Sequence, residues 1–164
     1  MQDQFNILVS EYKERLYWHI RRMVVSHDDA DDVLQNTFIK VFKNLHNFKG
    51  ESQLYTWLYR IATNESLTFL KKKARRLQLS DEQLQNRLTE NLKSDPYFDG
   101  NAAEEKLQNA INMLPQRQKQ VFLLKYYDEL PYSEISEILE TSVGSLKASY
   151  HHAVKKISKY VVEH

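Results

Sequence analysis

The sequence has no cysteine and only three glycines and three prolines in 164 residues. Without cysteine the chain forms no disulfide, no thiolate-ligated metal or iron–sulfur site and no thiol nucleophile, which fits a reducing compartment. Strand-rich folds need frequent turns, and turns use glycine and proline. The scarcity of both residues therefore predicts a fold with few turns and long helices.

Long apolar runs are also missing, so we expect no membrane insertion. The first residues lack the basic and then apolar order of a signal peptide, which predicts a cytoplasmic protein. Charge of one sign is not in excess, because 23 Lys and Arg face 22 Asp and Glu, for a formal net charge of +1. This balance argues against a protein that coats polyanions through bulk positive charge.

Apolar residues follow a helical period in two blocks, and the period fails between them. The intervening residues 77–103 contain Pro96 and Gly100, and their leucines are too sparse to build a core. A capping box at Ser80 and Gln83 allows one short helix there. We therefore predict an all-α protein with two small helical domains, residues 1–76 and 104–164, joined by a flexible linker, residues 77–103.

The charges nearly cancel over the whole chain, but they are clustered by sign along the sequence. Residues 60–76 hold six basic residues and one acid, residues 128–140 hold five acids and no base, and residues 141–162 hold four lysines and no acid. A short helix with Pro131 at its first helical position, a turn near 141–145 and a longer basic helix fit a helix-turn-helix, whose second helix enters the major groove of DNA. The alternative is a solvated lysine face.

Aromatic residues alternate with basic and polar ones between Leu45 and Arg76. Proteins bind unpaired bases on aromatic platforms beside a cationic track. On a helix, Tyr55 and Tyr59 lie one turn apart, and Asn64 lies about a turn beyond. The segment fits single-strand binding, with ordinary packing of an amphipathic helix as the alternative.

Two sets of motifs, in order and on either side of the linker, resemble the sigma-70 family of bacterial transcription initiation factors. The closest resemblance is to the extracytoplasmic-function (ECF) type, which keeps only the second and fourth conserved regions. Residues 28–42, 48–52 and 55–64 look like region two, and residues 114–124, 132–139 and 143–149 look like region four. The resemblance implies a two-domain promoter-recognition subunit that is not an enzyme and needs no cofactor or metal.

The resemblance also implies a role for individual residues. It assigns contact with the coiled coil of the polymerase β′ subunit to Asp31, Asp32, Gln35, Asn36 and Phe38, and contact with the β flap to the surface around Phe122. Binding of the non-template strand of the −10 element is assigned to Phe48, Lys49, Gly50, Ser52, Tyr55, Trp57, Tyr59, Arg60 and Asn64, and phosphate contact to Lys71, Lys72, Lys73, Arg75 and Arg76. One flipped base would sit near Lys49, Gly50, Ser52 and Asn64. Duplex recognition at the −35 element is assigned to Ser145, Lys147, Ala148, Ser149, His151, His152, Lys155 and Lys156. Implied partners are core RNA polymerase, promoter DNA and an anti-sigma factor, with a monomer when free.

The chain departs from the family pattern at several positions. Trp57 is followed by Leu58, where primary sigma factors have paired aromatics, so a weaker strand-opening wedge is expected. Many relatives have arginine, the commoner reader of guanine, near Ser149 and His152, so the −35 preference does not follow from the family. Glu140 stands where a small residue is frequent.

A linker of 27 residues reaches roughly 90 Å when extended. Two promoter elements one and a half to two helical turns apart are separated by roughly 50–70 Å. Because a flexible coil of this length averages about 30 Å, the linker must stretch to let both domains bind at once.

Two other function classes remain open at this point. A helix-turn-helix regulator with a ligand-sensing N-terminal domain would dimerise on palindromic DNA, but it leaves residues 48–76 without a purpose. A metal-dependent enzyme would use the acidic cluster or the adjacent histidines, namely His27, Asp28, Asp29, Asp31 and Asp32, or His151 and His152. The cluster lacks the glycine and spacing of a calcium loop, and adjacent histidines on a helix point about 100° apart.

Overall fold

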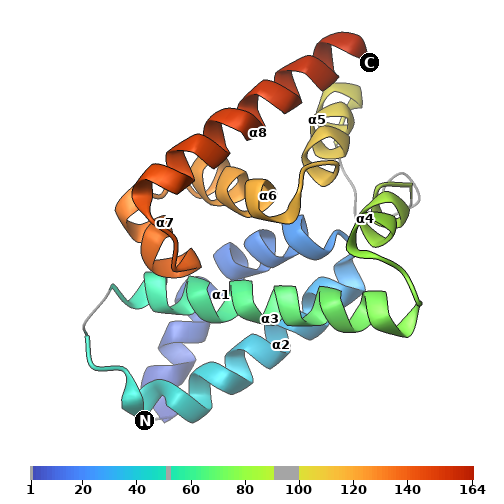
Figure 1. Ribbon diagram of the computed structural model, residues 1–164. Coiled ribbons are helices and arrows are strands. Elements are labelled where there is room, and N and C mark those ends of the chain that lie inside the picture. Colours follow the sequence, from blue (N-terminus) through green and yellow to red (C-terminus); the bar gives the residue numbers. More distant parts are fainter. Residues whose placement is uncertain (1, 51–52, 91–99) are drawn as a thin grey trace. The chain divides into compact units, whose positions relative to one another are not determined.

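The computed structural model describes residues 2–50, 53–90 and 100–164, and within these ranges it contains helices and no strand (Figure 1). The prediction of an all-α fold is confirmed. The chain divides into two compact units, Met1–Lys72 and Lys73–His164. Each unit has its own buried core and is described separately.

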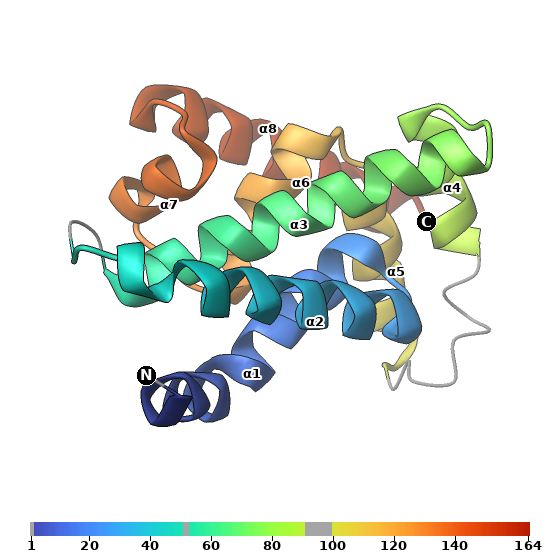
Figure 2. The same ribbon diagram turned by 90° about the horizontal axis from the view of Figure 1, so that it is seen from below.

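The first unit consists of α1 (Gln2–Val24), α2 (His27–Asn44), the short 3₁₀ helix η1 (Leu45–Asn47) and most of α3 (Leu54–Arg76) (Figures 1 and 2). Ser26 caps α2 by accepting a hydrogen bond from the amide of Asp29 at 3.2 Å. Apolar residues at three- and four-residue steps form the core: Leu8, Leu16, Ile20, Met23, Val24, Ala30, Val33, Leu34, Val41, Leu58, Ala62 and Leu70. Each of the three helices thus buries one apolar face.

Polar contacts fix α3 against the other two helices. His19 Nε2 and Thr63 Oγ1 form a buried hydrogen bond of 2.9 Å, which joins α1 to α3. Lys40 of α2 pairs with Glu65 of α3 at the surface. Because α3 carries most of the residues assigned to the −10 element, these contacts determine which of its faces remains accessible.

The second unit contains α4 (Asp81–Glu90), α5 (Ala102–Asn112), α6 (Gln116–Phe122), the π-helix η3 (Leu123–Tyr127), α7 (Tyr132–Leu139) and α8 (Val143–Glu163). Helices α5, α6 and α7 all pack against α8, drawn in red in Figure 1. The core of the second unit includes Leu84, Leu88, Ala110, Ile111, Leu114, Val121, Leu123, Leu124, Ile135, Ile138, Leu146, Ala153 and Ile157.

Helix α4 lies in the segment expected to be a flexible linker. The predicted capping box is confirmed: the Ser80 amide donates to Gln83 Oε1 at 2.8 Å, and the Gln83 amide donates to Ser80 Oγ at 3.1 Å. The expectation that the leucines here are too sparse for a core is wrong for Leu84 and Leu88, which are 2% and 4% exposed. One helical turn apart, they share a face, and α5 supplies the opposing surface.

Lys119 of α6 is fully buried in the second unit. Its Nζ donates to Gln85 Oε1 of α4 at 3.3 Å. Burial penalises the ammonium form and lowers the pKa of Lys119 from 10.5 to about 7. The unfolded chain therefore binds this proton more tightly than the folded chain between pH 7 and 10.

Replacing Lys119 with methionine should make the second unit more stable at pH 7. In the wild type, the free energy of unfolding should rise with pH from about 7 upward, by up to about 1.4 kcal/mol per pH unit, because the unfolded state holds the extra proton. Lys119→Met should remove this slope, which urea unfolding at pH 7, 8 and 9 would measure. The exposed Lys159→Met is the control and should keep it. An equal slope in both variants would contradict the assignment.

Candidate nucleic-acid and protein interfaces

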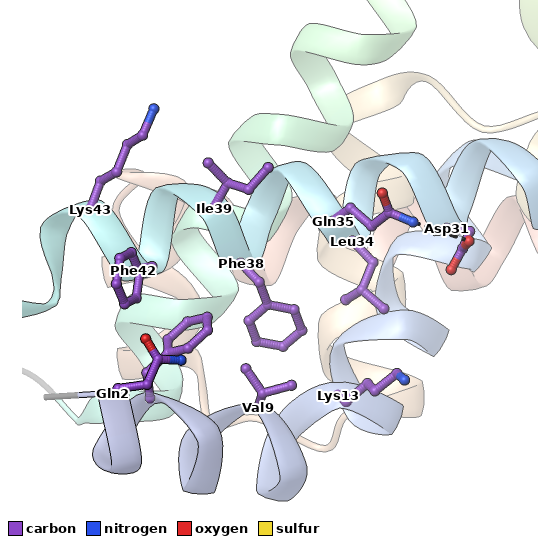
Figure 3. Close-up of a pocket in the computed structure, with 11 residues that line it drawn as sticks. Gln2, Val9, Lys13, Asp31, Leu34, Gln35, Phe38, Ile39, Phe42 and Lys43 are labelled. Carbon is purple, nitrogen blue, oxygen red and sulfur yellow. Dashed lines mark hydrogen bonds between the residues drawn. The ribbon is translucent and has the colours of Figure 1, made fainter.

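A groove of about 620 Å³ is lined by residues of α1 and α2 in the first unit (Figure 3). Figure 3 shows Val9 of α1 and Leu34 and Phe38 of α2 pointing into it. The ring of Phe5 packs edge-on against Phe38 and Phe42, with centroids 6.3 and 5.0 Å apart. The full lining is Gln2, Phe5, Val9, Lys13, Asp31, Leu34, Gln35, Phe38, Ile39, Phe42 and Lys43.

The residues assigned to the polymerase β′ subunit lie on or beside this groove. Asp31, Gln35 and Phe38 line it, and Gln35 donates to Asp31 at 3.4 Å. Asp32 and Asn36 are exposed on the same helix. The sequence did not predict the groove, because a helical repeat of apolar residues is also what core packing produces. In the structure, Ile39 and Phe42 are 51% and 40% exposed.

The residues assigned to the −10 element lie after η1, in the segment that leads to α3, and along α3 itself. Lys49, Gly50, Asn64, Lys71, Lys72, Arg75 and Arg76 are exposed, whereas Phe48, Tyr55, Trp57, Arg60 and Lys73 are half-buried. Ser52 lies outside the described residues. The rings of Phe48 and Trp57 lie 5.0 Å apart, so the loop and the start of α3 share one aromatic pair. Gly50 has φ of +74°, a left-handed conformation that glycine adopts at no steric cost.

Tyr59 corrects the sequence-based assignment. It is fully buried, so its ring cannot stack on a base. Its hydroxyl accepts a hydrogen bond from Arg15 Nε at 3.0 Å, and its ring lies 4.9 Å from that of His19. The cause is the angular position of Tyr59 on α3, on the side that faces α1.

Arg15 is a surface residue that the sequence analysis missed. Its guanidinium carbon lies 5.2 Å from the ring centre of Tyr55 and 5.3 Å from that of Tyr59. The contact joins α1 to α3 across 44 positions of sequence, and no local pattern signals such a pair. It places an arginine beside the half-buried Tyr55, an arrangement that cation–π attraction favours.

A helix-turn-helix is formed by α7, residues 140–142 and α8. Ser136 Oγ donates to the carbonyl of Thr141 at 2.6 Å, and Ser142 Oγ accepts from the Ser145 amide at 3.3 Å, so side chains hold both ends of the turn. Pro131 is the N-cap of α7, one position earlier than predicted. Glu140 ends α7 with φ of +52° and ψ of +47°, a left-handed conformation usually given to glycine.

Helix α8 has one buried and one exposed face. Leu146, Ala153 and Ile157 are buried against the rest of the unit. Among the residues assigned to the −35 element, Ser149 is half-buried, and these are exposed: Ser145, Lys147, Ala148, His151, His152, Lys155 and Lys156. The assigned set therefore occupies the solvent side of the helix.

Lys147 makes one contact that the sequence did not signal. Its Nζ lies 5.8 Å from the ring centre of Tyr132 at the start of α7. Lys125 Nζ lies 4.5 Å from the same ring. Two lysines from separate elements thus converge on one aromatic side chain beside the turn.

Phe122 corrects a second assignment, because its side chain is only 4% exposed. It stacks on Tyr126 and Tyr150, with ring centroids 5.0 and 5.9 Å away. Burial raises the pKa of the Tyr150 hydroxyl, and the nearby Tyr132 and Tyr126 add to this effect. The accessible residue of the cluster is Tyr126, which is 52% exposed.

In residues 2–50, 53–90 and 100–164, no group of three or more His, Asp or Glu side chains is arranged to hold a metal ion. In the same ranges, no helix combines the length and apolar character that crossing a membrane requires.

Comparison with known protein families accounts for both units. Residues 8–76 match the model of sigma-70 region 2, and residues 104–157 match the model of sigma-70 region 4. The chain is 32% identical to the ECF RNA polymerase sigma factor SigW of Bacillus subtilis, over 96% of this chain and 89% of that protein. It is also 32% identical to the ECF RNA polymerase sigma-E factor of Escherichia coli K12, over 98% of this chain and 87% of that one.

These matches show that the chain belongs to the sigma-70 family of RNA polymerase sigma factors, within its ECF group. Solved structures agree at the level of the fold. The sigma factor RpoE of Bartonella quintana, solved in complex with the anti-sigma factor NepR, matches with a TM-score of 0.75 at 18% identity, over 96% of each chain. CnrH, solved in complex with the cytosolic domain of CnrY, matches with a TM-score of 0.72 at 21% identity, over 99% of this chain and 90% of that one.

Replacing Glu140 with glycine should stabilise the helix-turn-helix. The left-handed conformation costs about 1–2 kcal/mol for a residue with a side chain, and glycine avoids this cost. About half of the benefit is lost, because glycine makes the unfolded chain more flexible and so more favourable in entropy. We expect the free energy of unfolding to rise by about 0.5–1 kcal/mol in denaturant titrations. Glu129→Gly, at φ of +53°, should act alike. Lys156→Gly, inside α8, should instead be destabilising, and the same sign at all three positions would contradict the explanation.

Proposed function

We propose that this ECF sigma factor directs promoter-specific initiation by binding core RNA polymerase and holding two promoter elements through different domains. The observation that carries the proposal is the match to regions 2 and 4 in one chain, each with an exposed basic surface. In region 2 the basic residues lie toward the end of α3, and in region 4 they line the solvent side of α8. The mechanism is conditional, because the near-neutral chain binds promoter DNA strongly only once polymerase holds it.

Polymerase contact in this proposal involves the α1–α2 groove. Exposed apolar side chains at a rimmed groove are typical of protein interaction sites, and Ile39 and Phe42 provide them here. The carboxylates of Asp31 and Asp32 flank the groove and favour a partner helix with basic residues. We assign this surface to the coiled coil of the β′ subunit, and the surface around Tyr126, in place of the buried Phe122, to the β flap.

Capture of the −10 element is assigned to the segment from Phe48 to Asn64. The half-buried Phe48 and Trp57 pair, and the Tyr55 ring beside Arg15, offer aromatic faces with an adjacent cation. Aromatic rings bind unpaired bases with about 1–3 kcal/mol per base. The exposed lysines and arginines at 71–76 then bind backbone phosphates.

Recognition of the −35 element is assigned to α8. Its exposed face presents hydroxyl, imidazole and ammonium groups, which can contact base edges and phosphates in the major groove. Lys155 and Lys156 suit the backbone. By analogy with the sigma factor RpoE solved in complex with the anti-sigma factor NepR, we also propose an anti-sigma factor as a partner that holds the free protein inactive.

Run-off transcription with purified core polymerase and promoter fragments from the source genome tests the proposal. Added protein should produce transcripts with a defined start, and core polymerase alone should not. If the protein never directs initiation but binds palindromic duplex DNA as a dimer, the proposal fails in favour of a helix-turn-helix regulator.

Replacing Asn64 with alanine should impair strand capture more than duplex binding. Asn64 is exposed on α3 within the proposed base pocket, so its loss should lower open-complex formation roughly tenfold, equivalent to about 1.4 kcal/mol. Permanganate reactivity of unpaired thymines measures opening, and footprinting of the −35 element measures duplex binding. Thr68→Ala, exposed one turn further along α3, is the matched control. An equal loss in both assays would remove the base-capture role.

A further inference from the structure

Polar side chains join α1 to α2 at the corner where the two helices meet. The Tyr17 hydroxyl of α1 lies 2.6 Å from Nδ1 of His27, the first residue of α2. Arg21 Nη1 donates to the same hydroxyl at 3.1 Å, and Arg21 Nε donates to the carbonyl of Val25 at 2.7 Å. These bonds tie the end of α1 to the start of α2, and we call Tyr17, Arg21 and His27 the corner clasp.

Val25, between the two helices, has a backbone conformation that is rare for its side chain. Its φ is +74°, in the left-handed region, which β-branched residues seldom adopt. The Val25 amide donates to the carbonyl of Arg21 at 2.8 Å, so Arg21 bonds this residue through both its backbone and its side chain. Unfavourable backbone conformations persist where surrounding contacts enforce them, and they cluster at functional sites. The contacts of Arg21 therefore support a costly turn, and this turn fixes the angle between two helices.

The corner clasp and the α1–α2 groove are parts of one seam between these helices. In Figure 3, Lys13 of α1 and Asp31 of α2 lie at the same end of the groove. Tyr17 is one helical turn beyond Lys13, and His27 is one turn before Asp31. The clasp therefore closes the seam at the end where the groove begins.

The apolar part of the groove lies far from the corner. Phe5 lies about 30 Å along α1 from the corner at 1.5 Å per residue, so a rotation of about 10° there moves it by roughly 5 Å. Ile39 and Phe42, the exposed apolar residues on the α2 side, are also several turns away from the corner. A small change of angle at the corner is therefore enough to widen or narrow the groove.

We propose that Tyr17, Arg21 and His27 are positioning residues for polymerase binding. They fix the angle between α1 and α2, and so hold the groove at the width that a partner helix requires. They act through the groove residues and do not touch the partner. The polymerase part of this inference rests on the proposed function, which places the partner in the groove. The effect of the clasp on the angle rests on the geometry of the first unit alone.

The angle is measured in the full chain as a distance between two spin labels. Because the chain has no cysteine, Ile7→Cys on α1 and Asn44→Cys at the end of α2 provide unique, exposed attachment sites. Tyr17→Phe removes the shared hydroxyl and should shift or broaden the distance distribution by roughly 5 Å, the displacement that about 10° produces. Tyr12→Phe makes the same change elsewhere on α1 and should leave the distribution unchanged. Circular dichroism checks that each variant is folded.

Replacements of His27 separate its hydrogen bond from the packing of its ring. His27→Ala removes the acceptor and should change the distances as Tyr17→Phe does. His27→Asn keeps an amide oxygen close to the position of Nδ1 and should restore the wild-type distribution. Loss of ring packing alone would affect both His27 variants alike. Wild-type distances in Tyr17→Phe and His27→Ala would overturn the proposal, because the clasp would then not set the angle.

Binding of purified core polymerase to the unlabelled variants tests the functional part. Tyr17→Phe and His27→Ala should weaken binding roughly tenfold, equivalent to about 1.4 kcal/mol, whereas His27→Asn and Tyr12→Phe should stay within about twofold of the wild type. Unchanged affinity in variants with altered distances would overturn the positioning role and leave the proposed function intact. Absence of binding by the wild type would instead overturn the proposed function, and the distances would still decide whether the clasp sets the angle.

Discussion

Packing of one face of α8 against α5, α6 and α7 is the contact on which the second unit depends. Leu146, Ala153 and Ile157 make that contact, and their burial fixes the rotation of the helix about its axis. Because a helix repeats every 3.6 residues, the same rotation determines that Lys147, His151 and Lys155 face solvent. The buried face thus sets the geometry of the proposed −35 interface, and the turn at 140–142 sets where that face begins.

The net charge of the chain is close to zero, but the structure separates the positive charges from the negative ones. Acids are concentrated in α7 and the preceding turn, while the lysines of α8 and the cations at the end of α3 are exposed. Each basic patch has acids elsewhere in the chain, so we expect the bulk attraction to DNA to be weak and salt-sensitive. In the proposed mechanism, polymerase supplies the rest of the affinity for a promoter, and selective binding follows from that dependence.

The fold was largely predictable from the sequence because helical periodicity is a local signal. The capping box at Ser80 and the all-α architecture required no knowledge of distant residues. Tyr55 and Tyr59 show the limit: they are one turn apart in the same pattern, yet only Tyr59 is buried, because α1 lies on that side of α3. The same reason explains why the sequence did not predict the burial of Phe122 and of the α4 leucines, or the ring contacts of Arg15. In each case the neighbouring side chains come from elements that are remote in sequence.

Burying the Lys119 amine costs free energy of folding, yet the second unit can still be stable. A methionine of similar length would fill the space without a desolvation penalty, so the lysine weakens the attachment of α4 rather than the core as a whole. The core is supported by many apolar contacts, whereas α4 contributes two leucines and one glutamine. A buried amine beside α4 therefore makes the packing of that helix sensitive to the protonation of Lys119.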